Sequence, residues 1–159
     1  MQFEGIIVGG SALILLGIIQ RQTQNLDLLN DSLALELVND AMLFAKSHGL
    51  AQDWLNNAPA GLKKDLPKHW EIRLQKVFDG RTITLHALGR CDLIKTKLWA
   101  LCDRTRDLPD VLALQPSALE LKEACDWLKP LDLNPGWILH VENTIAFVSK
   151  KLDYTNECT

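Results

Sequence analysis

Two groups of residues near the start of the chain have the types and spacing that phosphate and metal chemistry requires. The first is Gly9-Gly10-Ser11, which joins two apolar segments. A turn of this kind between a strand and a helix leaves backbone N–H groups unpaired around one point, and the helix dipole adds positive charge there. Glycine allows a ligand to approach the backbone closely, and the Ser11 hydroxyl can cap the helix or donate to a phosphate oxygen. The sequence therefore predicts a phosphate-binding turn.

The second group is Asn25 and Asp27, which are separated by one residue in a segment where polar and apolar side chains alternate. Alternate residues of a strand point to the same face, so we expect both side chains on one side of a sheet. Two acids at this spacing would hold a divalent cation beside a phosphate, as metal-assisted phosphoryl transfer requires. Asn25 offers only a neutral carbonyl oxygen, so weaker metal binding is expected.

These groups belong to a longer pattern that covers residues 9–13, Gly17, and residues 21–28. The pattern resembles the signature of the nucleotidyltransferase superfamily. More narrowly, it is similar to a bacterial nucleotidyltransferase-like family of uncertain function that is related to abortive-infection nucleotidyltransferase toxins. A second block over residues 92–110, with a lysine and an alanine followed by Arg104-x-Arg106-Asp107-x-x-Asp110, resembles the helical motif of the same proteins. The two blocks together span about two thirds of the chain.

The resemblance implies a role for each matching residue. The residues implied to bind phosphate or nucleotide are Gly9, Gly10, Ser11, Arg21, Thr23 and Lys97. Asp27 matches the second acid and would hold Mg²⁺, while Asn25 stands where the family has its first acid. Glu71 is the candidate for the third carboxylate that such sites carry on a later strand. Lys97 lies in the apolar band of its helix, where a charge needs a partner or an exit to solvent. Asp27 or a phosphate would be such a partner, and the alternative is a lysine that extends to the surface.

The implied activity is the Mg²⁺-dependent transfer of a nucleoside monophosphate from a nucleoside triphosphate to a hydroxyl of a macromolecule such as tRNA or protein. The asparagine at position 25 would weaken this activity. One alternative is a catalytically degenerate protein that binds a nucleotide without turnover. Another is an interaction protein, such as one member of a toxin–antitoxin-like pair. At the level of single residues, the glycine turn could be an ordinary strand-to-helix connection. The charged residues at 104–110 could form only ion pairs and caps.

Composition narrows the class of protein. The chain has 159 residues, of which 47% are hydrophobic and 23% charged, and its net charge is -3. These values are those of a globular domain and exclude disordered, collagen-like and coiled-coil classes. Residues 60–106 contain eleven Lys or Arg and only five Asp or Glu, so this basic stretch could face RNA or an acidic partner.

The order of strand and helix signals predicts an α+β fold: a small mixed sheet of the nucleotidyltransferase type, with helices packed on it and a helical C-terminal layer. We expect one nucleotidyltransferase-like domain over residues 1–159, with the sheet in 1–89 and the helical part in 90–153. Expected strands cover residues 5–8, 25–29, 70–77 and 82–88, with a hairpin at Asp79-Gly80. Expected helices cover residues 12–16, 33–48, 92–104, 117–129 and 135–152, with a further helix restarting at 107–110 and a short helix within 51–68.

Other signals bear on the cellular setting. The uncharged segment from Ile6 to Ile19 is too short for a membrane span and lacks the basic flank of a signal peptide. The four cysteines have no metal-ligand or disulfide spacing, so a reduced, cytoplasmic setting without membrane contact is expected. The chain begins almost at its first strand, and an edge left exposed there would favour a homodimer.

Overall fold

The structure is a computed structural model that describes residues 2–153. It divides into two compact units at the junction of Gly89 and Arg90. The first unit contains all the strands, and the second unit is helical. The α+β fold predicted from the sequence is therefore confirmed. Within the described residues, no helix is long and apolar enough to cross a membrane.

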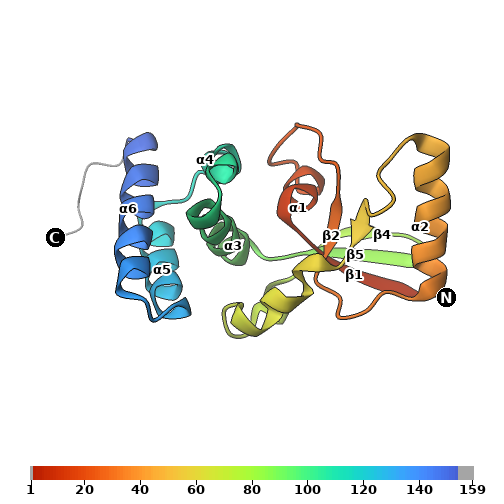
Figure 1. Cartoon of the computed structure of the whole chain (residues 1–159), viewed down its shortest axis with the longest axis horizontal. Coiled ribbons are helices and arrows are strands. Elements are labelled where there is room, and N and C mark those ends of the chain that lie inside the picture. Colours follow the sequence, from red (N-terminus) through yellow and green to blue (C-terminus); the bar gives the residue numbers. More distant parts are fainter. Residues whose placement is uncertain (1, 154–159) are drawn as a thin grey trace. The chain divides into compact units, whose positions relative to one another are not determined.

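The first unit is built around one five-stranded sheet with the order β3-β2-β1-β5-β4 (Figure 1). Its strands are β1 (Phe3–Val8), β2 (Leu26–Leu28), β3 (Leu55–Asn56), β4 (Gln75–Asp79) and β5 (Ile83–Ala87). The pairs β1–β5 and β2–β3 are parallel, and β1–β2 and β4–β5 are antiparallel. Its helices are α1 (Gly9–Leu15) and α2 (Leu35–His48), with 3₁₀ helices η1 (Ala58–Asp65) and η2 (Trp70–Arg73).

The two faces of the sheet differ in polarity because successive side chains of a strand alternate. Ile7 in β1 lies opposite Leu28 in β2 and Ala87 in β5, and all three are fully buried. On the same face, a methyl group on Gly5 would lie only 2.8 Å from the Leu85 side chain, so this core is closely packed. Burial of each large apolar side chain contributes roughly 1.5–3 kcal/mol. Burial of this face fixes the register of β1 with its neighbouring strands. It therefore also fixes which side chains of these strands lie on the opposite face.

The expected strand over residues 70–77 is wrong in its first half. Trp70 to Arg73 form the 3₁₀ helix η2, and the strand β4 begins only at Gln75. Trp70 is buried, which accounts for the apolar position in the sequence pattern without a strand. A methyl group on Gly89 would lie 2.6 Å from the Arg73 carbonyl oxygen, so the chain passes very close to the end of η2. The expected hairpin is confirmed, since Gly80 N–H donates to the Ile83 carbonyl and β4 pairs with β5.

Two other local expectations have opposite outcomes. Gly49 ends α2 in the left-handed conformation (φ 68°), as expected for a C-terminal glycine. The helix expected over residues 33–48 begins two residues later than expected, because α2 starts after Ala34, and it has no side-chain cap. Asn30 instead donates to the Glu4 carbonyl and accepts from Ile6 N–H, so it fastens the loop to β1.

The second unit consists of the helices α3 (Arg90–Asp103), α4 (Leu108–Leu114), α5 (Ala118–Leu128) and α6 (Pro135–Lys151). Short 3₁₀ helices, η3 (Thr105–Asp107) and η4 (Lys129–Leu131), connect them. Ser117 and Glu120 form a reciprocal capping box at the start of α5, and Asn134 caps α6 through Gly136 N–H. Fully buried apolar side chains from three helices form the core; they include Leu93, Leu98, Leu121, Leu128 and Val141.

Candidate functional site

The glycine turn lies beside the Asp27 carboxylate. Gly9 follows β1 directly and has a φ of +70°, a backbone conformation that favours glycine. Val8 lies opposite Asp27 in the pairing of β1 with β2, so the carboxylate emerges beside the turn. A methyl group on Gly9 would lie 3.3 Å from Asp27 Oδ2. The glycine turn and Asp27, which the sequence predicts to bind a phosphate and a cation side by side, are therefore adjacent.

The loop before β2 folds back onto the same turn. A methyl group on Gly10 would lie 3.4 Å from Arg21 Nη2 and 3.5 Å from Thr23 Oγ1. Thr23 Oγ1 donates to the Asn25 carbonyl at 3.3 Å, which keeps this loop tight. A guanidinium, a hydroxyl and a carboxylate thus surround two glycines in the first unit. Such a set offers donors for phosphate oxygens and one anionic ligand for a cation.

Asp27 is held by a residue that the sequence analysis did not single out. Asn56 Nδ2 donates to Asp27 Oδ1 at 2.9 Å, and Asn56 Oδ1 accepts from Ala58 N–H at 3.0 Å. Asn56 lies directly opposite Asp27 because β3 runs parallel to β2. The sequence analysis expected only a short helix within residues 51–68, so the strand β3 that carries Asn56 was missed. Asn56 ties one carboxylate oxygen and leaves Oδ2 on the side of Gly9.

Ser11 and Asn25 lie in positions less favourable for ligand binding than the sequence predicts. Ser11 is only 5% exposed, and its hydroxyl donates to the Val8 carbonyl at 3.2 Å. The N-cap of α1 is Val8, so the expected capping role of Ser11 is wrong. Asn25 is exposed and immediately precedes β2, which begins at Leu26. A ligand role for these two residues stays a prediction.

Glu71 lies in a different part of the sheet region. It is exposed in η2, before β4, and β4 is separated from β2 by β1 and β5. The expectation that Glu71 projects from a strand is wrong, because the segment over residues 70–73 is a 3₁₀ helix. Its role as a third carboxylate stays a prediction.

Lys97 is bound by two acids of its own unit. Its Nζ lies 3.0 Å from Asp107 Oδ1 and 2.6 Å from Asp110 Oδ2, and all three side chains are at most 8% exposed. Arg104 adds a contact of 3.2 Å to Asp107. The structure therefore gives Lys97 the acids of the second sequence block as partners, where Asp27 or a phosphate was expected. This arrangement matches the alternative interpretation in which residues 104–110 form an ion-pair network, and a phosphate role for Lys97 stays a prediction.

The donor set at the turn fits Mg²⁺ only in part. Among residues 2–153 there is no group of three or more His, Cys, Asp or Glu that could hold a metal ion. Asp27 supplies a single carboxylate oxygen toward the turn. Mg²⁺ commonly takes one or two carboxylates and completes its shell with substrate phosphates and water. The site therefore suits Mg²⁺ that arrives with a nucleotide and does not suit a free ion.

A hollow of about 810 Å³ adjoins this site. It is lined by Ile14, by the loop over residues 20–24 and by residues 49–51. Arg21 and Thr23 belong both to this hollow and to the surroundings of Gly10. The hollow has the size of a small-molecule site and begins where Arg21 and Thr23 lie beside Gly10.

A mixed sheet whose first strand leads through a glycine turn into a helix, with an acid on the adjacent strand facing that turn, defines a nucleotidyltransferase-like core. The family model described as "nucleotidyltransferase of unknown function" (DUF6036) matches residues 1–128. The chain belongs to this family, and the family membership expected from the sequence is confirmed. No curated protein and no solved structure matches the chain.

Proposed function

We propose that this protein binds a nucleoside triphosphate together with Mg²⁺ and transfers its nucleoside monophosphate to a hydroxyl of a macromolecule, with release of pyrophosphate and of the hydroxyl proton. The observation that carries the proposal is the position of Asp27 Oδ2 against Gly9, with Arg21 and Thr23 against Gly10. Phosphate-binding groups and a metal-binding group thereby meet at one point, as phosphoryl transfer requires. Membership of a nucleotidyltransferase family supports the same assignment.

Each group at the turn has a distinct role in this proposal. Backbone N–H groups at Gly9 and Gly10 hold the β- and γ-phosphates, and Arg21 neutralises their charge. The seven-residue helix α1 is short, so these local donors and Arg21 matter more than the helix dipole. Asp27 would hold Mg²⁺, which would supply positive charge to the triphosphate when bound. The remainder of the nucleotide occupies the hollow along residues 20–24.

Asn25 limits the activity. The second carboxylate of such a site would add charge to the metal and help to deprotonate the attacking hydroxyl. An amide oxygen supplies neither the charge nor the base. We therefore expect slow transfer, supported by positioning and by electrostatic stabilisation of the phosphates.

A second candidate function is nucleotide binding without turnover. Two observations favour it: the absence of an acidic cluster within residues 2–153 and the presence of asparagine at position 25. In this version the same turn binds the triphosphate, and the chain acts through the complex that it forms.

Calorimetric titration separates the two functions from each other and from no nucleotide binding. Mg²⁺ with ATP, CTP or GTP is titrated into the wild type and into Asp27→Ala. Binding that requires Mg²⁺ and weakens at least tenfold in Asp27→Ala supports the transferase site. Binding that is equal with and without Mg²⁺ supports the degenerate site. The absence of binding by all three nucleotides contradicts both.

Asp53→Ala is a matched control in the same unit. Asp53 accepts from Asn56 through its backbone carbonyl only, so removing its exposed carboxylate leaves the contact with Asn56 in place. Its nucleotide affinity should equal that of the wild type. Transfer itself is measured with α-labelled nucleotide and with tRNA or total protein as acceptor.

A further inference from the structure

The hollow beside the glycine turn has a polar part and an apolar part. The loop over residues 20–24 supplies the polar side chains, and Ile14, Leu50 and Ala51 supply the apolar ones. Among the described residues that line the hollow, Arg21 alone carries a charge, and its guanidinium lies beside Gly10. Positive charge is therefore found next to the phosphate-binding turn, and the rest of the hollow suits an uncharged part of a ligand.

Leu50 is an apolar side chain that the fold holds in an exposed position. Gly49 ends α2 in the left-handed conformation, and Leu50 N–H donates to the Ala45 carbonyl at 3.0 Å. The end of the helix thus fixes the backbone of Leu50, yet the residue remains 42% exposed. Covering an exposed apolar side chain with an apolar ligand surface is favourable. Leu50 is therefore positioned in advance to contact such a surface in the hollow.

Ile14 joins the apolar part of the hollow to the glycine turn. It lies in α1, which begins with Gly9 and Gly10, so one short helix carries both the turn and an apolar wall. Ile14 is four residues beyond Gly10, which corresponds to about 6 Å along the helix axis at about 1.5 Å per residue. A nucleoside triphosphate has the same order of parts, since a ribose separates its charged phosphates from its flat and largely apolar base.

The polar side chains of the hollow are suited to the edge of a base. Gln20, Gln22 and Gln24 line it and are exposed. A glutamine amide carries both hydrogen-bond donors and an acceptor, and rotation of the amide exchanges their positions. These side chains can therefore meet different arrangements of donors and acceptors.

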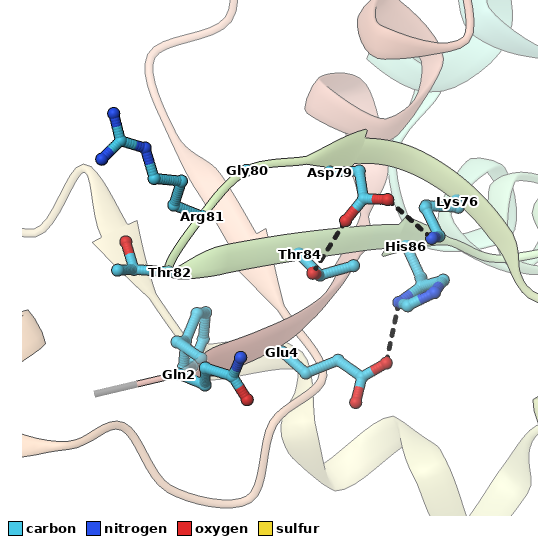
Figure 2. Close-up of a pocket in the computed structure, with 10 residues that line it drawn as sticks. Gln2, Glu4, Lys76, Asp79, Gly80, Arg81, Thr82, Thr84 and His86 are labelled. Atoms are coloured by element: carbon cyan, nitrogen blue, oxygen red, sulfur yellow. Dashed lines mark hydrogen bonds and ion pairs between the residues drawn. The ribbon is translucent and has the colours of Figure 1, made fainter.

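A second pocket of the first unit, of about 630 Å³, lacks this combination (Figure 2). It lies at β1, β4 and β5, and its charged side chains already have partners. Lys76 Nζ lies 2.8 Å from Asp79 Oδ2, and His86 Nδ1 lies 3.3 Å from Glu4 Oε1. None of the residues that surround the glycine turn belongs to its lining. The hollow beside the turn is therefore the better place for the uncharged part of a nucleotide.

We propose that the nucleobase of the donor triphosphate packs against Leu50 in the hollow, and that the amides of residues 20, 22 and 24 adapt to its edge. This inference rests on the proposed function, because the phosphates of the same nucleotide occupy the glycine turn. An aliphatic side chain does not distinguish one base from another, and a rotatable amide suits either order of donor and acceptor. The substrate class is therefore a nucleoside triphosphate with any of the four bases, with affinities within about tenfold of one another.

The test compares ATP with ribose 5-triphosphate, which has the same ribose and phosphates but no base. Each is titrated with Mg²⁺ into the full chain by calorimetry. The wild type should bind ATP at least about tenfold more tightly than ribose 5-triphosphate, because only ATP covers Leu50. Leu50→Ser should lose this advantage and should still bind ribose 5-triphosphate as the wild type does.

Leu43→Ser is the matched control. Leu43 is a leucine of α2 that is 67% exposed and does not line the hollow, so this variant should keep the full advantage of ATP. A measurement on the wild type supports the comparison without any substitution. In an NMR titration, ATP should shift the amide resonances of residues 49–51, and ribose 5-triphosphate should leave them in place.

Four outcomes would contradict the proposal. Equal affinity of the wild type for ATP and ribose 5-triphosphate would overturn it and would leave the glycine turn as a triphosphate site. Equal affinity of Leu50→Ser and the wild type for ATP would show that the base lies elsewhere. A clear preference, beyond about tenfold, for one of ATP, GTP, CTP and UTP would show that its edge is read by fixed groups. No binding of any of these compounds would contradict the proposed function and this inference together.

Discussion

Asn56 fixes the orientation of Asp27. Its amide donates to Asp27 Oδ1 at 2.9 Å, and its own carbonyl oxygen accepts from Ala58 N–H at 3.0 Å. The second contact prevents the amide from turning over, so the donor always faces the carboxylate. Asp27 Oδ2 then points to Gly9, where a nucleotide-bound cation would lie. Asn56 is in this sense a positioning residue for the candidate site.

The first prediction concerns Asn56→Ala. Removing the amide lets the Asp27 carboxylate rotate and leaves Oδ1 without its donor, so the affinity for Mg²⁺ with ATP should fall by about tenfold. The affinity for ATP without Mg²⁺ should change much less, because the glycine turn and Arg21 are intact. Calorimetry in the presence and absence of Mg²⁺ measures both.

Asn57→Ala is the matched control for this variant. Asn57 donates to the carbonyl oxygens of Asn30 and Asp31 at 3.0 and 3.2 Å, so it fastens the same region without touching Asp27. Both variants should lose about 1 kcal/mol of unfolding free energy, but only Asn56→Ala should lose Mg²⁺-dependent affinity. Equal losses of affinity in the two variants would reduce Asn56 to a purely structural residue.

The second prediction concerns Gly9→Ala. Gly9 has a φ of +70°, and the added methyl group would lie 3.3 Å from Asp27 Oδ2. The substitution therefore strains the backbone and displaces the carboxylate, so we expect a loss of about 1–2 kcal/mol in stability and of nucleotide binding. Chemical denaturation and calorimetry measure the two effects. Gly61→Ala is the control, because nothing lies within 4 Å of its added methyl group and its φ is not positive.

The third prediction tests the position of Asn25. Asn25→Asp places an acid where the resemblance implies the first acid, and a second carboxylate should tighten Mg²⁺-dependent binding of ATP by about tenfold and accelerate any transfer. The double variant with Asp27→Ala should lose this gain. If Asn25→Asp leaves the Mg²⁺ dependence unchanged, residue 25 does not face the metal.

The convergence of residues 9–10 with Asp27 was predictable because it depends on local patterns. A β-branched segment, two glycines and an alternating segment specify strand, turn and strand, and their pairing is between neighbours in sequence. The position of Asn56 was not predictable in the same way. β3 has only two residues, one of them an asparagine, and it exists because it pairs with β2. β3 is thus formed by pairing with a distant segment, and the strand propensity of its own two residues does not predict it.

The prediction of a strand over residues 70–77 was wrong in its first half for a related reason. Alternation of Trp70, Ile72 and Leu74 imitates a strand, but Trp70 is buried while Ile72 is 84% exposed, so the pattern does not describe one buried face. His69 has a φ of 61°, which turns the chain into η2 just before this segment. The spacing of apolar residues does not reveal a change of backbone direction at a single residue such as His69.

The fourth prediction distinguishes a structural from a ligand-binding role of Lys97. Lys97→Met leaves Asp107 and Asp110 buried without their shared cation, so the second unit should lose roughly 3–5 kcal/mol of stability. This corresponds to a fall of about 12 °C or more in the melting temperature of that unit. Lys95→Met, on the same helix and half-buried, should change the melting temperature by little. An unchanged melting temperature for Lys97→Met combined with lost nucleotide affinity would favour the phosphate role instead.

The fifth prediction concerns the pH dependence of the second unit through Glu120. Partial burial alone would raise the pKa of Glu120, but hydrogen bonds from Arg90 and from the Ser117 backbone outweigh it and leave the pKa below its ordinary value of 4.5. A carboxyl whose pKa is lower in the folded chain stabilises the fold at pH values above 4.5, and this contribution is lost as the pH falls through the lower folded value. Glu120→Gln keeps an amide that can still serve the capping box with Ser117, so the substitution removes mainly the charge that faces Arg90. The wild type should exceed Glu120→Gln by about 0.5–1 kcal/mol in urea unfolding at neutral pH, and the difference should vanish at pH values well below 4.5. A difference that persists in acid would show that the loss comes from the cap and not from the ion pair.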